Sequence, residues 1–420
     1  MTTDRIIYQS ESLFISKLLG SGGSDQIVNT DIKEINRVQD MSYNLEVART
    51  DINEFGQLAA LSREVTEPPT VALDFSYYLT DGTQEDRLGF NLNSGAKFPV
   101  SAPQPMTKSL LDGTNDVDEL NYYIVTSPEG EDTHGNTIKA ADHGCIGIGN
   151  GFITSYGITA AVGELATATV SVEASNILFK SDLSSAMANP AIDIDSTTGG
   201  KLPNTIDWAS VNSSDGNIGV GGSEIFAIRP GDITIDFDAV GYFDGSKSAG
   251  DLNVGGARLG GAGAELGSGN TAVHVQNISL DIPVSRSPLT RIGNHYPFAR
   301  KVDFPVNMTL SASALMTDFT DGSLDQLICS AEQQRDIAII MKDRCGNNNA
   351  MTYIMRNAIL DTQAFSASIG DNKTVDLTFS CQVGGANDTN NGIFLFAQPG
   401  NVVNLYGTTP TVGPYVTPTP

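Results

Sequence analysis

The feature of this sequence that most constrains its fold is a segment that occurs twice. The stretch "VQDMSYNLEVAR" (Val38–Arg49) returns as "VQNISLDIPVSR" (Val275–Arg286), and a shift of 237 positions aligns Val38–Asp81 with Val275–Asp318 without a gap. Of these 44 positions 13 are identical, whereas unrelated stretches of ordinary composition share about three. The identical positions are Val38, Gln39, Ser42, Val47, Arg49, Gly56, Arg63, Val65, Pro68, Leu73, Ser76, Thr80 and Asp81. Such a repeat decides the architecture before any other feature does.

The correspondence resumes further along the chain with a different shift. Ile153–Ala174 matches Leu360–Cys381, with Gly163 aligned on Gly370. Upstream, Ser10–Ser16 occupies the place of Gly231–Phe237, with weaker similarity. The repeated unit is therefore a whole domain of about 170 residues.

Most of the repeated unit has the alternating pattern of β-strands. Apolar residues recur at every second position from Met41 to Val47, from Val71 to Leu79 and from Ala166 to Val172, which is typical of half-buried strands. The second copy repeats this over Ile278–Val284 and Val306–Ala314. The stretch Ser323–Asp336 instead has helical spacing, with Leu324, Leu327 and Ile328 on one face. The sequence predicts a mainly β protein with two tandem antiparallel units, each with one short flanking helix.

Composition suggests where these units begin and end. We expect domain 1 over residues 1–180, a connector rich in Ser, Asp, Asn and Gly over 181–223, and domain 2 over 224–399. Domain 2 contains a glycine-rich loop at 248–270. Prolines prevent regular structure in residues 400–420, which we expect to be extended.

Charge and cysteine content exclude several classes of protein. The formal net charge is −25, from 24 basic and 49 acidic residues, and this repels phosphate, so reading of a nucleic-acid sequence is not expected. Four scattered cysteines (Cys145, Cys329, Cys345 and Cys381) predict reduced thiols rather than a disulfide framework. The first residues lack the pattern of a secretory signal, and no apolar run reaches the roughly 20 residues of a membrane helix. We therefore expect a protein made in a cytoplasm, without a membrane partner.

No motif predicts catalysis, a metal or a cofactor. His143 and Cys145 are close, but no second pair at metal-ligand spacing accompanies them. Gly147–Gly151 does not complete a dinucleotide fingerprint, and the acidic stretches Asp112–Glu119 and Asp193–Ser196 do not fit calcium-loop spacing. Nucleophile elbows and phosphate loops are absent from the sequence. We expect no cofactor and no enzymatic activity.

Several stretches together resemble the major tail tube proteins of long-tailed bacteriophages, in the form with a duplicated tube domain. They are "YQSESLFIS", "RVQDMSYNLEVARTDINEFGQLAALSREVTEPPTVALDFSYYLTDG", "GFITSYGITAAVGELATATVSVEASN", "RPGDITIDF" and "PFARKVDFPVNMTLSASAL". The resemblance implies β-sandwich or barrel-like tube domains, six of which form a ring around a lumen, with rings stacked into a tube. Since each chain carries two such domains, three chains would complete a ring, which implies a homotrimer.

The same resemblance implies partners and a location. The partners would be further copies of the chain, other tail proteins (tape measure, tail terminator, and baseplate or distal tail protein), and double-stranded DNA passing through the lumen without sequence specificity. The location would be the virion tail, assembled in the host bacterial cytoplasm. In this setting the acidic composition would prevent the lumen wall from holding DNA.

Two strand faces are candidates for the lumen wall. They carry small hydroxyl residues and unpaired carboxylates at alternating positions: Thr167, Thr169, Ser171, Glu173, Thr234, Asp236 and Asp238. A period of two does not distinguish a lumen from ordinary solvent, so both interpretations stay open. Arg49 and Arg286, at matching places in the repeat, are candidates for contacts between subunits or domains, with a local ion pair as the alternative.

Two other functions are compatible with two β-sandwich domains. A virion surface adhesin or receptor-binding module would be expected to show aromatic loops and calcium sites, but the chain has one tryptophan, Trp208. A glycan-cleaving enzyme would need a catalytic carboxylate pair, which the sequence does not identify. The structural tube subunit is the favoured hypothesis.

Overall fold

The chain folds as a mainly β protein in the computed structural model. The structure describes residues 11–19, 27–28, 31–94, 103–112, 118–128, 133, 143–193, 202, 204–206, 208, 227–236, 274–293, 296–315, 334–342, 349–366 and 374–397. The predicted loop 248–270 and the predicted extended segment 400–420 lie outside these residues.

The N-terminal half, residues 11–180, contains most of the short elements. They are β1 (Glu11–Lys17), β2 (Lys33–Ile35), β3 (Val38–Glu46), β4 (Arg49–Ile52), β5 (Ser62–Val65), β6 (Thr70–Tyr78), α1 (Thr83–Arg87), β7 (Leu92–Ser94), α2 (Lys108–Asp112), β8 (Leu120–Thr126), β9 (Gly144–Ala161), β10 (Thr167–Ala174) and β11 (Asn176–Lys180). The strands predicted from alternation in this half lie on β3, β6 and β10.

The C-terminal half, residues 230–397, repeats the same order of long strands. Its elements are the 3-10 helix η5 (Pro230–Asp232), β14 (Ile233–Asp236), β15 (His274–Pro283), β16 (Arg286–Leu289), β17 (Ala299–Val302), β18 (Val306–Leu315), β19 (Arg335–Lys342), β20 (Asn349–Ser366), β21 (Thr374–Val383) and β22 (Gly392–Ala397). Between the halves, β12 (Met187–Ala188) pairs with β13 (Thr205–Ile206).

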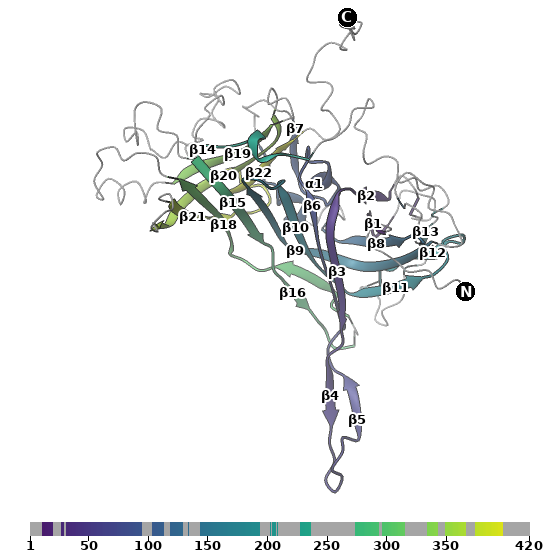
Figure 1. The fold of residues 1–420 in the computed structure, drawn as a ribbon. Coiled ribbons are helices and arrows are strands. Elements are labelled where there is room, and N and C mark those ends of the chain that lie inside the picture. The colour runs from purple at the N-terminus through teal and green to yellow at the C-terminus, as the bar shows by residue number, and fades with distance from the viewer. Residues whose placement is uncertain are drawn as a thin grey trace, which may run out of the picture.

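The two halves share one large sheet. Its strand order is β14-β19-β20-β21-β18-β15-β9-β10-β6-β3, with β1, β2, β7, β8, β11 and β22 attached off this path. The junction is the antiparallel pair of β15 with β9, in which Leu280 lies opposite Ile158. Figure 1 shows the curved sheet across the body of the molecule, with β4 and β5 projecting away from it.

The core is also continuous across the junction. Buried side chains alternate along β6, β10, β18 and β21, as expected for strands with one buried face. A single cluster contains Ile158 and Val170 from the N-terminal half together with Leu280 and Phe379 from the C-terminal half. Two tandem units were predicted from the sequence, whereas the observed halves bury their apolar faces together.

The structural correspondence of the halves extends to backbone irregularities. Shifted by 237 positions, the bounds of β4 and β5 coincide with those of β16 and β17. The β3–β6 pair shifts register after Val38, and the β15–β18 pair shifts after the equivalent Val275. At a shift of 207, Asn150 and Asn357 have φ angles of 55° and 56°, in the left-handed region. The two halves therefore have equivalent residues at the level of single positions.

Each half contains one long strand. β9 and β20 each have 18 residues. The first part of β9 pairs with β8 and β11, and its last part pairs with β10 and β15. The first part of β20 pairs with β19 and β22, and its last part pairs with β21. Each long strand therefore connects the large sheet to a second group of strands.

The helix predicted over Ser323–Asp336 is wrong at its C-terminal end. Arg335 and Asp336 belong to β19, which pairs antiparallel with β20. β19 has the β-strand composition Ile-Ala-Ile-Ile-Met, and this pairing overrides helical spacing at its first residues. Residues 323–333 lie outside the described part of the chain. The short helices that the structure does describe, α1 and α2, are in the N-terminal half.

The predicted connector at 181–223 is packed where the structure describes it. Leu183, Met187 and Trp208 are buried in a second cluster with Phe14 and Tyr123. The ring of Trp208 meets Phe14 edge-on at 5.8 Å and Tyr123 at 5.4 Å between centroids. These contacts hold Trp208 of the connector against β1 and β8.

Candidate assembly surfaces

One face of the large sheet points away from the core. On β10, Thr167, Thr169, Ser171 and Glu173 alternate with buried Ala168, Val170, Val172 and Ala174. Four of the predicted lumen-facing residues therefore lie together on this face, which we call the open face.

The open face continues across the junction into the C-terminal half. One row runs from strand to strand through neighbouring Cα partners: Ser76, Thr169, Gly157, Asp281, Thr309 and Ser380. A Cβ atom at Gly157 would lie 2.9 Å from the hydroxyl oxygen of Thr169, so the glycine makes room for its neighbour. Hydroxyl groups and carboxylates thus form a continuous polar surface over six strands.

The strands of this face carry carboxylates but no Lys or Arg of their own. The open-face part of the sheet comprises β3, β6, β9, β10, β15, β18, β21 and residues 359–366 of β20, and these segments contain no Lys or Arg. Their carboxylates include Asp74, Glu173, Asp281 and Asp376. The sequence predicts that Glu173 is unpaired, and this is wrong, because Arg300 of the β16–β17 hairpin forms a salt bridge with it. Since the whole chain has 24 Lys and Arg residues, their absence from these segments is a local property of the sheet.

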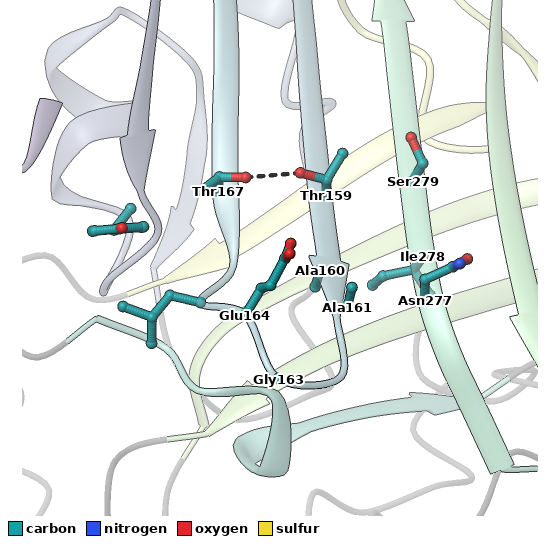
Figure 2. Close-up of a pocket in the computed structure, with 11 residues that line it drawn as sticks. Thr159, Ala160, Ala161, Gly163, Glu164, Thr167, Asn277, Ile278 and Ser279 are labelled. Atoms are coloured by element: carbon teal, nitrogen blue, oxygen red, sulfur yellow. Dashed lines mark hydrogen bonds between the residues drawn. The ribbon is translucent and has the colours of Figure 1, made fainter. Parts of the chain in front are cut away.

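A depression of about 610 Å³ lies at one end of the open face, beside the turn between β9 and β10. Figure 2 shows Thr159 and Thr167 pointing toward each other, with Asn277 and Ser279 on the neighbouring β15. The two threonine hydroxyl oxygens are 2.7 Å apart. Glu164 is the carboxylate in this lining. The depression therefore extends the polar, acidic character of the face to its edge.

The other predicted lumen-facing residues are not near β10. Thr234 and Asp236 lie on β14, which is at the opposite end of the strand order and pairs with β19. Asp238 lies outside the described residues. The structure therefore brings together the β10 candidates but not the second set.

The predicted contact residue Arg286 lies between the two halves. Its Nη2 donates to the backbone oxygen of Leu110 at 3.0 Å, and its Nη1 is 3.8 Å from Oδ2 of Asp118. Its guanidinium carbon is 5.0 Å from the ring centroid of Phe152. Arg300, on the paired β17, forms a salt bridge with Glu173 on β10. The hairpin β16–β17 is thus packed on the N-terminal half.

Glu119 lies beside this contact. Burial raises its pKa to about 7, while a hydrogen bond from Asn150 Nδ2 to Oε1 at 2.7 Å and the charges of Arg300 and Arg286 act in the opposite direction. Burial also lowers the pKa of Arg286, against the attraction of Asp118 and Glu119. The hairpin contact therefore encloses ionisable groups whose charged forms are poorly solvated.

Arg49 is at the equivalent position of the other hairpin, but its surroundings differ. Every residue of β4 is exposed, and β5 is exposed except for partly buried Ser62. Arg63, which corresponds to Arg300, pairs with Asp51 of its own hairpin at 2.7 Å. The tips of both hairpins carry a fully exposed apolar side chain at equivalent positions, Phe55 and Ile292.

In the open-face part of the large sheet, two strand edges have no partner among the described strands. β3 pairs with β6 on one side only, and residues 359–366 of β20 pair with β21 on one side only. Large apolar side chains are exposed beside these edges: Tyr43 (42%), Leu45 (52%) and Phe365 (51%). Exposed edges with apolar side chains are the usual sites of strand pairing between chains.

A buried hydrogen-bonded cluster connects the halves beneath the open face. The hydroxyl groups of Tyr77 and Tyr156 both donate to Oε1 of Glu85 at 2.9 Å. The hydroxyl oxygens of Tyr156 and Tyr353 are 2.8 Å apart. Burial raises the pKa of the Glu85 carboxyl group, and the tyrosine hydrogen bonds partly offset this. The cluster joins α1 and β6 to a strand of the C-terminal half.

Sequence reasoning missed the free edges and this cluster. Glu85 follows the repeat, in a stretch where the two copies no longer align, so no pattern marks it as buried. The exposed side chains of β3 have the same alternation as the buried ones of β15. The only sequence signal for the unpaired edge is the repeat itself, because β3 has the pattern of its paired equivalent β15 but lies at an edge.

Among the described residues, no group of three or more His, Cys, Asp or Glu side chains is arranged to hold a metal ion. In the same part of the chain, no helix is long and apolar enough to cross a membrane.

Comparison with known proteins finds similarity at the level of solved structures only. No protein-family model matches the chain, and no curated protein matches it. The sheath–tube complex of an extracellular contractile injection system (PVC, extended state) is 14% identical, covering 31% of this chain and 85% of that chain, with a TM-score of 0.25. The tube-terminating cap of the anti-feeding prophage is 12% identical over 33% of this chain and 95% of that chain, with a TM-score of 0.24. The tail of an empty GTA particle is 11% identical over 27% and 80%, with a TM-score of 0.19. Each similarity concerns a limited part of the molecule.

Proposed function

We propose that this protein is a structural subunit of a bacteriophage-type tail tube. Three chains join edge to edge into a ring of six repeated units, and rings stack into a tube. The open face lines the lumen, through which viral DNA passes during genome ejection. The proposal locates the protein in the virion tail, assembled in the host cytoplasm, with the tape measure, terminator and distal tail proteins as further partners.

The observation that carries this proposal is the junction between the halves. β15 and β9 join two equivalent units in one continuous sheet, with buried side chains on one face and polar side chains on the other. The strands equivalent to β15 and β9 are β3 and β20, and both have a free edge at the two ends of this arrangement. The chain forms this contact once internally and leaves the two partner edges of the same contact open at its opposite ends. Copies of such a chain assemble into a closed ring or an open filament.

The charge of the open face supports passage of DNA. The strands of this wall contain no Lys or Arg, and Arg300, which reaches it from the β16–β17 hairpin, is buried and paired with Glu173. The wall therefore offers no exposed, unpaired cation for a phosphate to bind. Like charges repel across a narrow lumen, and counterion release, which drives ordinary protein–DNA binding, needs basic side chains. A duplex would therefore move past this surface without being held.

The exposed hairpin tips support stacking of rings. Phe55 and Ile292 are equivalent residues, each fully exposed and each followed by a glycine with positive φ. Apolar side chains displayed at the ends of projecting hairpins are suited to contacts with a neighbouring ring. Two such tips per chain would give six contacts in a ring of three chains.

The proposal is tested with the purified full-length chain by native mass spectrometry and negative-stain electron microscopy. We expect a smallest ring with the mass of three 44.4 kDa chains, and hollow stacked rings with six-fold appearance. Monomers that stay monodisperse at every concentration reached would overturn the proposal.

Two exposed phenylalanines provide a matched pair for the same assay. Phe365 is 51% exposed beside the free edge of β20, and Phe179 is 65% exposed on β11, which pairs with β9 and is not one of the two edges proposed for assembly. We expect Phe365→Asp to abolish rings because it places a charge in the contact, and Phe179→Asp to leave them intact. Equal assembly of the two variants would contradict an edge-to-edge ring.

A further inference from the structure

The junction inside the chain predicts how two copies of the chain meet. In the β15–β9 pair, Leu280 lies opposite Ile158, and Ser279 lies opposite Thr159. All these residues belong to segments that have an equivalent in the other half. The internal junction is therefore a template whose register can be transferred residue by residue to the free edges.

The transfer from β15 to β3 uses the shift of 237 positions. β3 pairs with β6 as β15 pairs with β18: Met41 is opposite Phe75, and the equivalent Ile278 is opposite Ala312. The register shifts in both pairs fall at equivalent residues. Leu280 therefore corresponds to Tyr43, and Ser279 corresponds to Ser42.

The transfer from β9 to β20 uses the shift of 207 positions. Thr167 is opposite Thr159 in the β10–β9 pair, and the equivalent Thr374 is opposite Ser366 in the β21–β20 pair. Both pairs have a register shift five residues further along β10 and β21, between equivalent positions. Ile158 therefore corresponds to Phe365, and Thr159 corresponds to Ser366.

We propose that β3 of one copy pairs antiparallel with residues 362–366 of β20 in the next copy, with Tyr43 opposite Phe365 and Ser42 opposite Ser366. This contact deepens the proposed function and rests on it, because it is the seam that closes the ring. Its occupant is a second copy of this chain.

Exposure supports the same seam. Tyr43 and Phe365 are 42% and 51% exposed, whereas their equivalents at the internal junction, Leu280 and Ile158, are 2% and 0% exposed. Strand pairing would bury the two aromatic rings against each other, as aromatic cross-strand neighbours do in other sheets. It would also pair the backbone groups on the sides of β3 and β20 that have no partner among the described strands.

The proposed contact between copies would continue the polar side of the open face from one copy to the next. Ser42 and Ser366 lie on the polar side of their strands, opposite the side of Tyr43 and Phe365. Their pairing places two more hydroxyl residues side by side, as Ser279 and Thr159 are at the internal junction. The polar row would then continue from one copy to the next.

The register is tested by cysteine cross-linking in the full-length chain. In the double variant Tyr43→Cys with Phe365→Cys, we expect mild oxidation to convert monomer into covalent multimers up to a trimer, reversed by a reducing agent. The matched control is Tyr43→Cys with Ala364→Cys, because a slip of one residue points the second thiol to the opposite face. Single variants measure the background from the native cysteines.

These experiments distinguish an error in the proposed register from an error in the proposed ring. If the unmodified protein forms rings but the 43/364 pair cross-links and the 43/365 pair does not, the register is wrong and the tube hypothesis survives. If the unmodified protein never associates, both proposals fail.

A second pair of variants covers the case in which the cysteine variants do not assemble. Ser42→Glu with Ser366→Glu places two carboxylates opposite each other and is expected to abolish rings. Ser42→Lys with Ser366→Glu is expected to restore them. The proposed pairing would be overturned if both double variants fail to form rings, or if both form them.

Discussion

The segment from β3 to β5 and the segment from β15 to β17 have the same elements 237 positions apart, but opposite surroundings. Leu45 on β3 is 52% exposed, whereas its equivalent Ile282 on β15 is fully buried. Arg63 and Arg300 differ in the same way, because Arg300 reaches Glu173 in the other half of the chain and Arg63 reaches only its own hairpin. The second segment is packed because the N-terminal half lies beside it, and the first segment has no such neighbour among the described residues.

This difference explains what a duplication does physically. A single unit has one edge of each kind, both exposed. Joining two units in one chain converts one pair of edges into an internal contact with a shared core, and leaves one pair for assembly. The packed segment therefore shows, within one chain, the environment that the exposed segment is suited to enter.

The largest expected effect comes from truncating equivalent core and edge positions, Ile282→Ala and Leu45→Ala. Ile282→Ala leaves a cavity at the junction and should lower the free energy of unfolding by about 2–5 kcal/mol. Leu45→Ala removes an exposed side chain and should change the stability of the unassembled chain by less than about 0.5 kcal/mol. Urea unfolding at a concentration too low for assembly measures both.

Ring formation by the same two variants tests whether β3 is an edge used in assembly. Leu45→Ala should weaken ring formation although it leaves the monomer stable. If both substitutions destabilise the monomer equally, then β3 is covered within the chain and is not a free edge.

The strands were largely predictable from the sequence, but their partners were not. Val71 to Leu79 alternate because β6 has one buried face, and this pattern is local. The patterns of β3 and β15 are equally clear, although one strand is exposed and the other buried, since burial depends on a neighbour that the pattern does not specify. For the same reason Arg49 and Arg286 looked equivalent, and Thr234 resembled the residues of β10 although β14 lies at the far end of the sheet.

The second-largest expected effect is a dependence of the free energy of unfolding on pH. Glu119 lies at the packed hairpin with a pKa raised to about 7. Leu120 lies opposite Gly151 as Arg335 lies opposite the equivalent Ala358, so the residue that corresponds to Glu119 is Gln334, which is exposed. The folded state holds the Glu119 proton to higher pH than the unfolded chain does, so stability falls from about pH 4.5 to about pH 7 and is flat above it. At one pKa unit per 1.36 kcal/mol the loss is on the order of 3 kcal/mol.

The variant Glu119→Gln places the residue of the exposed half in the packed half and removes this titration. We expect the difference in unfolding free energy between variant and wild type to grow with pH over that window. Asp118 raises the pKa of this carboxyl group, whereas Arg286 and Arg300 lower it, so a difference that is constant with pH would mean that the two arginines hold Glu119 charged throughout.

The smallest expected effect separates the two hairpins directly, through Arg300→Met and Arg63→Met. Arg300 is almost fully buried and its partner Glu173 is 34% exposed, so its loss should cost about 1–2 kcal/mol as one charge-assisted contact disappears and the carboxylate returns to solvent. The Arg63–Asp51 pair is exposed on both sides and should contribute between about 0 and 1 kcal/mol. Thermal unfolding at low concentration measures both, and methionine keeps the apolar stem in each case. An equal cost at both sites would indicate that the β4–β5 hairpin already packs on a neighbour in solution. In rings, by contrast, the cost of Arg63→Met should rise toward that of Arg300→Met, because assembly gives the exposed hairpin the surroundings that the packed one has.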